Sequence, residues 1–258
     1  MHEHDTSPKP APEHEAGIET VSSAYQSVIA DLAYLSMPVT AGKRLYALME
    51  KYGVKTKEQL ERMRPGALWE EVVLPNIESG RDLAQKIHRE KGQALVVPGI
   101  FDASGLHWGR NEYMVLWLRL ISERMKKIYL ADGWEYASGG AAEFVRGAMI
   151  HFHFAIREES MTMYDAAARK IDMSSGAMLI ARAIEDLRKR GFENPRLTNE
   201  FRTLASLAYT LSILAKTDRR RWEIHIGGTQ GFSSFWILSA AHSLGVKPAY
   251  LLEGLPPL

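Results

Sequence analysis

The sequence predicts an open α/β fold with a mostly parallel sheet, followed by a mainly helical C-terminal region. Short apolar runs typical of buried strands alternate with amphipathic helical patterns as far as Ile150. Alternation of this kind implies parallel strands that are joined by right-handed crossovers. Helical patterns dominate the rest of the chain. We therefore expect a disordered tail over 1–17, an α/β domain over 18–155 and a mainly helical region over 156–258.

The expected elements follow from apolar periodicity and from the residues that interrupt it. The tail is rich in Pro, His and Glu and has no apolar periodicity, which is typical of a disordered segment. Two helical patterns and a Pro65-Gly66 turn predict a helical insertion over 42–75, which is either a cap over a site or a plain connection. The other elements expected in this domain are a strand over 32–36, a helix over 79–91, a strand over 94–97, a helix over 111–126, a strand over 128–130 and a helix over 141–150.

The C-terminal region begins with a segment that resembles a strand pair, 161–171, with a turn near Ala166. Helices are then expected over 174–190, where Asp172 or Ser174 caps the start and Gly191 ends the helix. The last expected elements are a helix over 197–216, a strand over 221–226 and a helix over 231–244.

Composition excludes several classes of function. The net charge of +1 gives no general electrostatic reason for binding duplex nucleic acid. The absence of cysteine excludes disulfides, Cys-based zinc sites and thiol catalysis. No apolar run approaches the roughly 20 residues that span a bilayer, and the polar N-terminus does not resemble a signal peptide. We therefore expect a cytoplasmic protein without a membrane partner. We expect no metal site either, because the pair His151 and His153 lacks the third ligand that such a site would need.

The three expected strands end at Ser36, Val97 and Leu130. Because the carboxyl ends of parallel strands lie side by side, the loops that follow them should surround one crevice. Glu143 follows the third of these loops, in the first turn of the helix expected from Ala141. The helix dipole would favour its ionised form, which a carboxylate nucleophile needs. The alternative is that Glu143 only stabilises the start of its helix.

Two motifs of the predicted sheet resemble a known family. The run GWEYASGGAAE (133–143) resembles the loop GWE-x-S-x-GA-x-x-E of nucleoside 2-deoxyribosyltransferases and nucleoside 5′-monophosphate N-glycosidases. The run AYLSMPVTAG (33–42) resembles their first strand and loop, YLSGP-x-TG. Ser138 stands one place later than in that pattern, and Met37 replaces a glycine. The resemblance covers residues 30–150, without a counterpart for 43–75 or for the C-terminal third, and it implies a small flavodoxin-like or Rossmann-like domain.

The resemblance implies cleavage of an N-glycosidic bond, by hydrolysis or by transfer of the sugar to a second base. Such a reaction needs a carboxylate beneath the anomeric carbon and a means of protonating the departing base. Glu143 would be the nucleophile, Tyr34 would hydrogen-bond to it, and Asp132 would protonate or orient the base. The alternatives are a core aromatic for Tyr34 and an ordinary loop acid for Asp132.

The remaining candidates would bind the substrate, and no cofactor or metal is implied. Hydroxyls and amides would hold the 5′-hydroxyl or 5′-phosphate, and aromatic and polar side chains of the loops would contact the base or flank the pocket. These candidates are Ser36, Met37, Asp102, His107, Trp108, Asn111, Trp134, Ser138, Gly139 and Gly140. A rival reading is a non-catalytic sensor of a nucleotide-derived ligand on the same fold.

We also expect a homo-oligomer. Relatives of this kind complete each pocket with residues of a neighbouring subunit, and four leucines of the expected helix over 197–216 supply apolar surface. These leucines are Leu204, Leu207, Leu211 and Leu214. They would equally suit the interior of a single chain.

Overall fold

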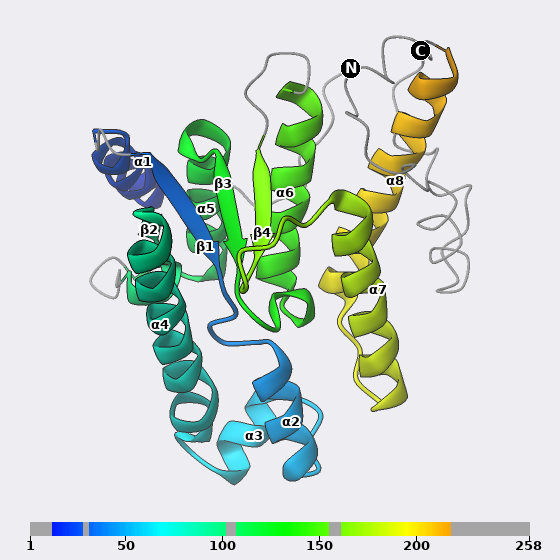
Figure 1. Ribbon diagram of the computed structural model, residues 1–258. Coiled ribbons are helices and arrows are strands. Elements are labelled where there is room, and N and C mark those ends of the chain that lie inside the picture. Colours follow the sequence, from blue (N-terminus) through cyan, green and yellow to red (C-terminus); the bar gives the residue numbers. More distant parts are fainter. Residues whose placement is uncertain (1–11, 28–30, 102–106, 155–160, 218–258) are drawn as a thin grey trace.

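A four-stranded, wholly parallel sheet forms the centre of the protein (Figure 1). The computed structural model describes residues 12–27, 31–101, 107–154 and 161–217. The strands are β1 (Leu32–Ser36), β2 (Ala94–Val96), β3 (Lys127–Leu130) and β4 (Thr162–Asp165). Their order across the sheet is β2-β1-β3-β4, and every pairing is parallel. The predicted open α/β fold is therefore confirmed.

Helices cover both faces of the sheet, which explains why β1 is apolar along nearly its whole length and buried at every position. The helix α4 (Leu74–Lys91) packs on one face, against Ala33 and Leu35. The other face carries α1 (Pro12–Gln26), α5 (Arg110–Arg124) and α6 (Ser138–Phe154). Side chains alternate along a strand, so Tyr34 and Ser36 point toward the face that α6 covers.

The segment predicted to be an insertion, 42–75, contains the two expected helices, α2 (Lys43–Lys51) and α3 (Lys57–Met63). A capping box between Thr56 and Gln59 sets the start of α3. Both helices lie beyond the carboxyl end of β1, where the chain leaves the sheet and enters α2 (Figure 1). The Tyr46 hydroxyl of α2 accepts a hydrogen bond of 3.0 Å from the Asn194 side chain, so the insertion also contacts the C-terminal region.

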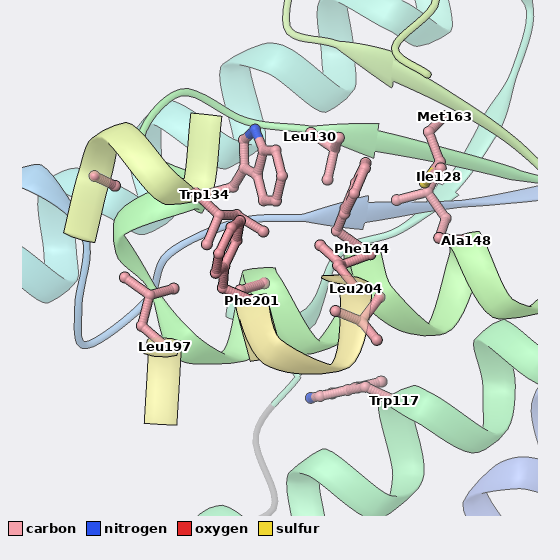
Figure 2. Close-up of a cluster of buried hydrophobic side chains, with 14 of the residues drawn as sticks. Trp117, Ile128, Leu130, Trp134, Phe144, Ala148, Met163, Leu197, Phe201 and Leu204 are labelled. Atoms are coloured by element: carbon pink, nitrogen blue, oxygen red, sulfur yellow. The ribbon is translucent and has the colours of Figure 1, made fainter. Parts of the chain in front are cut away.

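The described part of the C-terminal region shares one hydrophobic core with the sheet. It contains α7 (Met173–Lys189) and α8 (Pro195–Thr217), and α8 packs against α6 and α7. Figure 2 shows Phe201 and Leu204 of α8 in the same cluster as Trp134 and Phe144. Among the four leucines that suggested a subunit interface, Leu204 is fully buried and Leu207 partly buried in the single chain.

Several boundaries differ from the predicted ones. Residues 12–17 belong to α1, so the tail prediction is wrong for them, while 1–11 lie outside the described residues. A π-helical turn, η1 (Trp69–Val73), runs directly into α4, which therefore begins before the predicted residue 79. Two short 3-10 turns, η2 (Pro98–Ile100) and η4 (Trp134–Tyr136), interrupt the loops after β2 and β3.

The segment 161–171 differs most from its prediction. Its first part is β4, which joins the main sheet beside β3, while the returning part forms a single antiparallel bridge between Tyr164 and Lys170. The elements expected at 221–226 and 231–244 lie outside the described residues. Among the residues that the structure describes, no helix is long and apolar enough to cross a membrane.

Candidate functional site

A hydrogen-bonded pair, Tyr34 and Glu143, lies between β1 and α6. The Tyr34 hydroxyl donates a hydrogen bond of 2.6 Å to Oε1 of Glu143. Tyr34 is fully buried and Glu143 is 5% exposed. The hydrogen bond that the family resemblance implies is therefore present, while the catalytic role of the pair stays a prediction.

Burial controls the protonation of this pair. It raises the pKa of Glu143 to about 7, and the nearby Ser36 hydroxyl and the hydrogen bond from Tyr34 only partly oppose the rise. Burial and the neighbouring Glu143 also raise the pKa of Tyr34 well above its usual value, so Tyr34 stays a hydrogen-bond donor at neutral pH.

The expected position of Glu143 in its helix was wrong. The helix α6 begins at Ser138 and not at Ala141, which places Glu143 in the second turn, and the first turn contains no acid. The helix dipole acts mainly within the first turn, so it does not hold Glu143 in its ionised form.

Two buried oxygen atoms beside the pair have no hydrogen-bond partner. They are Oε2 of Glu143 and Oγ of Ser36, which do not meet each other with hydrogen-bond geometry. Nearly all buried polar atoms of folded proteins are paired, so an unpaired one calls for a functional or structural explanation. Tyr34, Ser36 and Glu143 therefore form a polar cluster at the carboxyl end of β1 with unused hydrogen-bonding capacity.

The first turn of α6 lies next to Arg110, the first residue of α5. Its guanidinium donates a hydrogen bond of 3.1 Å to the Ser138 hydroxyl. The first amides of a helix have no partner within the helix and attract anions. Gly140 permits this turn to approach η4 closely, because a Cβ at Gly140 would lie 2.8 Å from the Trp134 carbonyl oxygen.

Asp132 lies in a neighbouring cavity and not beside Glu143. Its side chain is 86% exposed and accepts a hydrogen bond of 3.0 Å from Lys43, which also contacts Glu135 at 3.1 Å. The cavity has a volume of about 470 Å³ and lies between the loops after β3 and β4 and the start of α7. Lys43, Asp132, Trp134 and Glu135 line it, whereas Glu143 does not.

Three of the candidate substrate contacts are used in packing. Trp108 is 9% exposed and packs against Phe101 and Tyr113. Trp134 is 3% exposed and packs on Phe144, with the ring centroids 4.8 Å apart. Met37 points to the face of the sheet that α4 covers, away from Tyr34 and Glu143.

On that face, the Met37 side chain fills the space that Gly80 and Gly99 leave open. Of the remaining candidates, His107 and Asn111 are exposed, and His107 has a left-handed backbone with φ of 53°. Asp102 lies outside the described residues.

The sequence did not reveal that charged side chains of α3 and α8 act electrostatically on Arg110. Arg196 and Glu200 of α8 and Lys57 of α3 all interact with it electrostatically. No spacing in the sequence connects Arg110 and Lys57 with the pair Arg196 and Glu200, because they belong to three separate helices.

No group of three metal-ligating side chains occurs among the described residues. His151 contacts the Met161 carbonyl oxygen at 2.9 Å, and the side chain of His153 lies outside the described part of the chain.

Comparisons of the chain with protein families, with curated proteins and with solved structures find no match.

Proposed function

We propose that the protein cleaves the N-glycosidic bond of a nucleoside or nucleoside 5′-monophosphate, with Glu143 as the nucleophile. The observation that carries the proposal is the buried Tyr34–Glu143 hydrogen bond, which leaves Oε2 of Glu143 without a partner. The resemblance of 33–42 and 133–143 to N-glycosidases and deoxyribosyltransferases supports it.

The sheet order offers further support. The order β2-β1-β3-β4 agrees with the first four strands of a flavodoxin-like sheet, in which ligands bind where the strand order reverses. In this chain the reversal lies between β1 and β3, and Ser36 and Leu130 end those two strands side by side. The polar cluster of Tyr34, Ser36 and Glu143 lies on β1 and on the helix that follows β3.

In the proposed reaction, Oε2 of Glu143 attacks the anomeric carbon while the bond to the base breaks. The electron pair of that bond leaves with the base, which is protonated as it departs, and a glycosyl ester of Glu143 remains. Water or a second base then displaces the carboxylate, which gives hydrolysis or transfer. A pKa of about 7 leaves a substantial fraction of Glu143 ionised at neutral pH, and Tyr34 keeps Oε1 in place.

The proposal places two demands on the protein. The sugar must displace neighbouring side chains to reach Oε2, because Glu143 is only 5% exposed. Asp132, which is predicted to protonate or orient the base, must leave its ion pair with Lys43 to reach the glycosidic bond.

A second candidate function is non-catalytic binding of a nucleotide-derived ligand. The burial of Glu143 and its absence from the lining of the 470 Å³ cavity favour this alternative. The ligand would occupy that cavity, beside Lys43 and Asp132, and Glu143 would be a buried structural group.

The two candidates differ in whether free base is released. The purified protein is incubated with a panel of nucleosides and their 5′-monophosphates, and free bases are measured by mass spectrometry. Glu143→Gln should abolish release by several orders of magnitude, whereas Glu78→Gln, at an exposed position of α4, should retain it. Binding without any release would support the sensor, and retention of more than about a tenth of the activity in Glu143→Gln would remove Glu143 from the nucleophile role.

A further inference from the structure

One lysine joins the start of α2 to the loop after β3. Lys43 is the first residue of α2, and its ammonium lies 3.0 Å from Oδ1 of Asp132 and 3.1 Å from Oε1 of Glu135. The ammonium also lies over the Tyr136 ring, 5.5 Å from the ring centroid. All three partners belong to one short stretch of the chain, 132–136, which contains the turn η4. A single side chain therefore contacts this loop at three points.

The backbones of the two segments also approach each other closely. Gly133 has a left-handed backbone with φ of 80°, and a Cβ at this position would lie 3.6 Å from the Lys43 amide nitrogen. Gly42, which precedes α2, has φ of 84°, and a Cβ there would lie 3.5 Å from the Gly133 carbonyl oxygen. Close contact of the two loops, and not only a long side chain, brings Lys43 to its two acids.

The two acids that share Lys43 differ in burial. The Glu135 side chain is 11% exposed, whereas that of Asp132 is 86% exposed. An ion pair of exposed side chains contributes little, so the contact with Asp132 does not by itself fix Lys43. Withdrawing Lys43 from Glu135 would leave a buried charge without compensation, which is costly. Glu135 is therefore the fixed partner of Lys43, and Asp132 is the partner that can exchange.

The charges around Lys43 do not cancel. Burial acts to lower the pKa of Lys43, but the hydrogen bonds and charges of Asp132 and Glu135 outweigh it and raise the pKa, so Lys43 stays an ammonium at neutral pH. One ammonium between two carboxylates leaves one negative charge. All three side chains line the 470 Å³ cavity, so this charge is offered to whatever occupies the cavity.

We propose that Lys43 and Glu135 form a buried pair that positions Asp132 for a ligand in this cavity. Lys43 holds the Asp132 carboxylate beside the empty cavity. When a nucleoside binds, Asp132 exchanges Lys43 for an N–H group of the base, and Glu135 continues to neutralise Lys43. No buried charge is left unpaired by the exchange. Lys43 and Glu135 are positioning residues because they act through Asp132.

The inference rests on the proposed function, because both candidate functions place a nucleoside or nucleotide beside Asp132. It explains how Asp132 can leave its ion pair with Lys43 at little cost. Lys43 begins the segment 43–75, which has no counterpart in the resembling family, so the arrangement is a feature of this chain.

Hydrogen–deuterium exchange tests the fixed pair in the full chain without any ligand. Lys43→Gln should speed exchange in the turn η4, because the turn loses its ion pair with α2. Lys43→Arg should restore slow exchange, since a guanidinium can pair with both acids. The amides to follow donate hydrogen bonds within this turn and belong to Trp134, Tyr136 and Ala137.

A matched control and a second variant accompany this measurement. Lys51→Gln removes an exposed cation from the same helix, where it pairs with Glu71 on the surface, and should leave exchange in η4 unchanged. Glu135→Gln removes the buried charge instead of exposing it, so it serves if Lys43→Gln does not fold. Exchange in η4 that is the same in Lys43→Gln as in Lys51→Gln would overturn the proposal.

A double-mutant cycle shows whether the pair acts through Asp132. The value of kcat/KM is measured for base release from adenosine, guanosine, cytidine, uridine and their 5′-monophosphates, and Kd replaces it where a compound binds without release. Glu135→Gln leaves Lys43 with Asp132 alone, so Asp132 exchanges less readily, and kcat/KM should fall about tenfold or more. In an Asp132→Asn background the same substitution should matter less than about twofold. Equal losses in both backgrounds are the signature of a merely structural role and would overturn the proposal.

The two measurements separate this proposal from the proposed function. Faster exchange in Lys43→Gln and coupling of Glu135 to Asp132 in nucleoside Kd, without base release by the natural chain, would uphold the positioning pair and reject the glycosidase. Base release by the natural chain that is unchanged in Glu135→Gln would reject the positioning pair and uphold the glycosidase. The absence of both binding and release would overturn both proposals.

Discussion

Replacing Glu143 by glutamine should make the folded protein more stable at pH 8. Burial raises the pKa of Glu143 from 4.5 to about 7, so the folded state holds this proton more tightly than the unfolded chain does. The stability associated with the protonated carboxyl is fully present below about pH 4.5. It is lost progressively as the pH rises to about 7, because the buried group must then ionise.

The magnitude follows from the two pKa values. A rise from 4.5 to about 7 corresponds to about 3 kcal/mol at pH 8 and to less than about 1 kcal/mol at pH 5. Glutamine avoids this cost because it does not ionise. Its amide oxygen can accept the hydrogen bond from Tyr34, so the pairing of the Tyr34 hydroxyl is kept.

Urea unfolding of both proteins at pH 5, 6, 7 and 8 measures the difference in the free energy of unfolding. The gap in favour of Glu143→Gln should widen as the pH rises, to about 3 kcal/mol at pH 8. Glu78→Gln removes an exposed carboxylate from α4 and is expected to show no such widening. A gap that is independent of pH, or a glutamine variant that is less stable at pH 8, would refute the reasoning.

Four further outcomes are expected. Gly140→Ala should destabilise the protein by about 1–3 kcal/mol in thermal unfolding, because its Cβ would lie 2.8 Å from a backbone oxygen. In the control variant Gly139→Ala, the Cβ meets only ordinary contacts, so this variant should be as stable as the natural chain or more stable. Tyr34→Phe removes a hydrogen bond that lowers the pKa of Glu143, so the pH at which activity rises should move upward in a pH–rate profile. Phe201→Ala should cost about 3–5 kcal/mol in urea unfolding, since this ring is fully buried. Light scattering should give a mass above the 29.0 kDa of one chain, and a 29.0 kDa particle at micromolar concentration would contradict the expected homo-oligomer.

Apolar periodicity predicted most elements of the α/β part because each is strongly patterned by itself. The runs that became β1 and β3 are short and apolar, and Gly92 ends α4 in the left-handed conformation that glycine favours. The fourth strand was mistaken for part of a hairpin. Periodicity shows that 162–165 is extended, but it does not show that its hydrogen-bond partner is β3.

The candidate site was predicted only in part, for two physical reasons. The Tyr34–Glu143 contact joins residues 109 positions apart, and only the family resemblance connected them. The start of α6 was placed too late because Gly139 and Gly140 suggested a loop, although close packing against η4 requires glycine at the second of these positions.

The packing of Phe144 connects the candidate site to the C-terminal region. Phe144 follows Glu143 on α6, and its ring packs on Trp134 and lies so close to Gly176 of α7 that a Cβ there would overlap it. A chain shortened to the α/β part would therefore uncover this ring. A side chain at Gly176 would therefore displace Phe144, the residue next to Glu143, although the two positions lie far apart in the sequence.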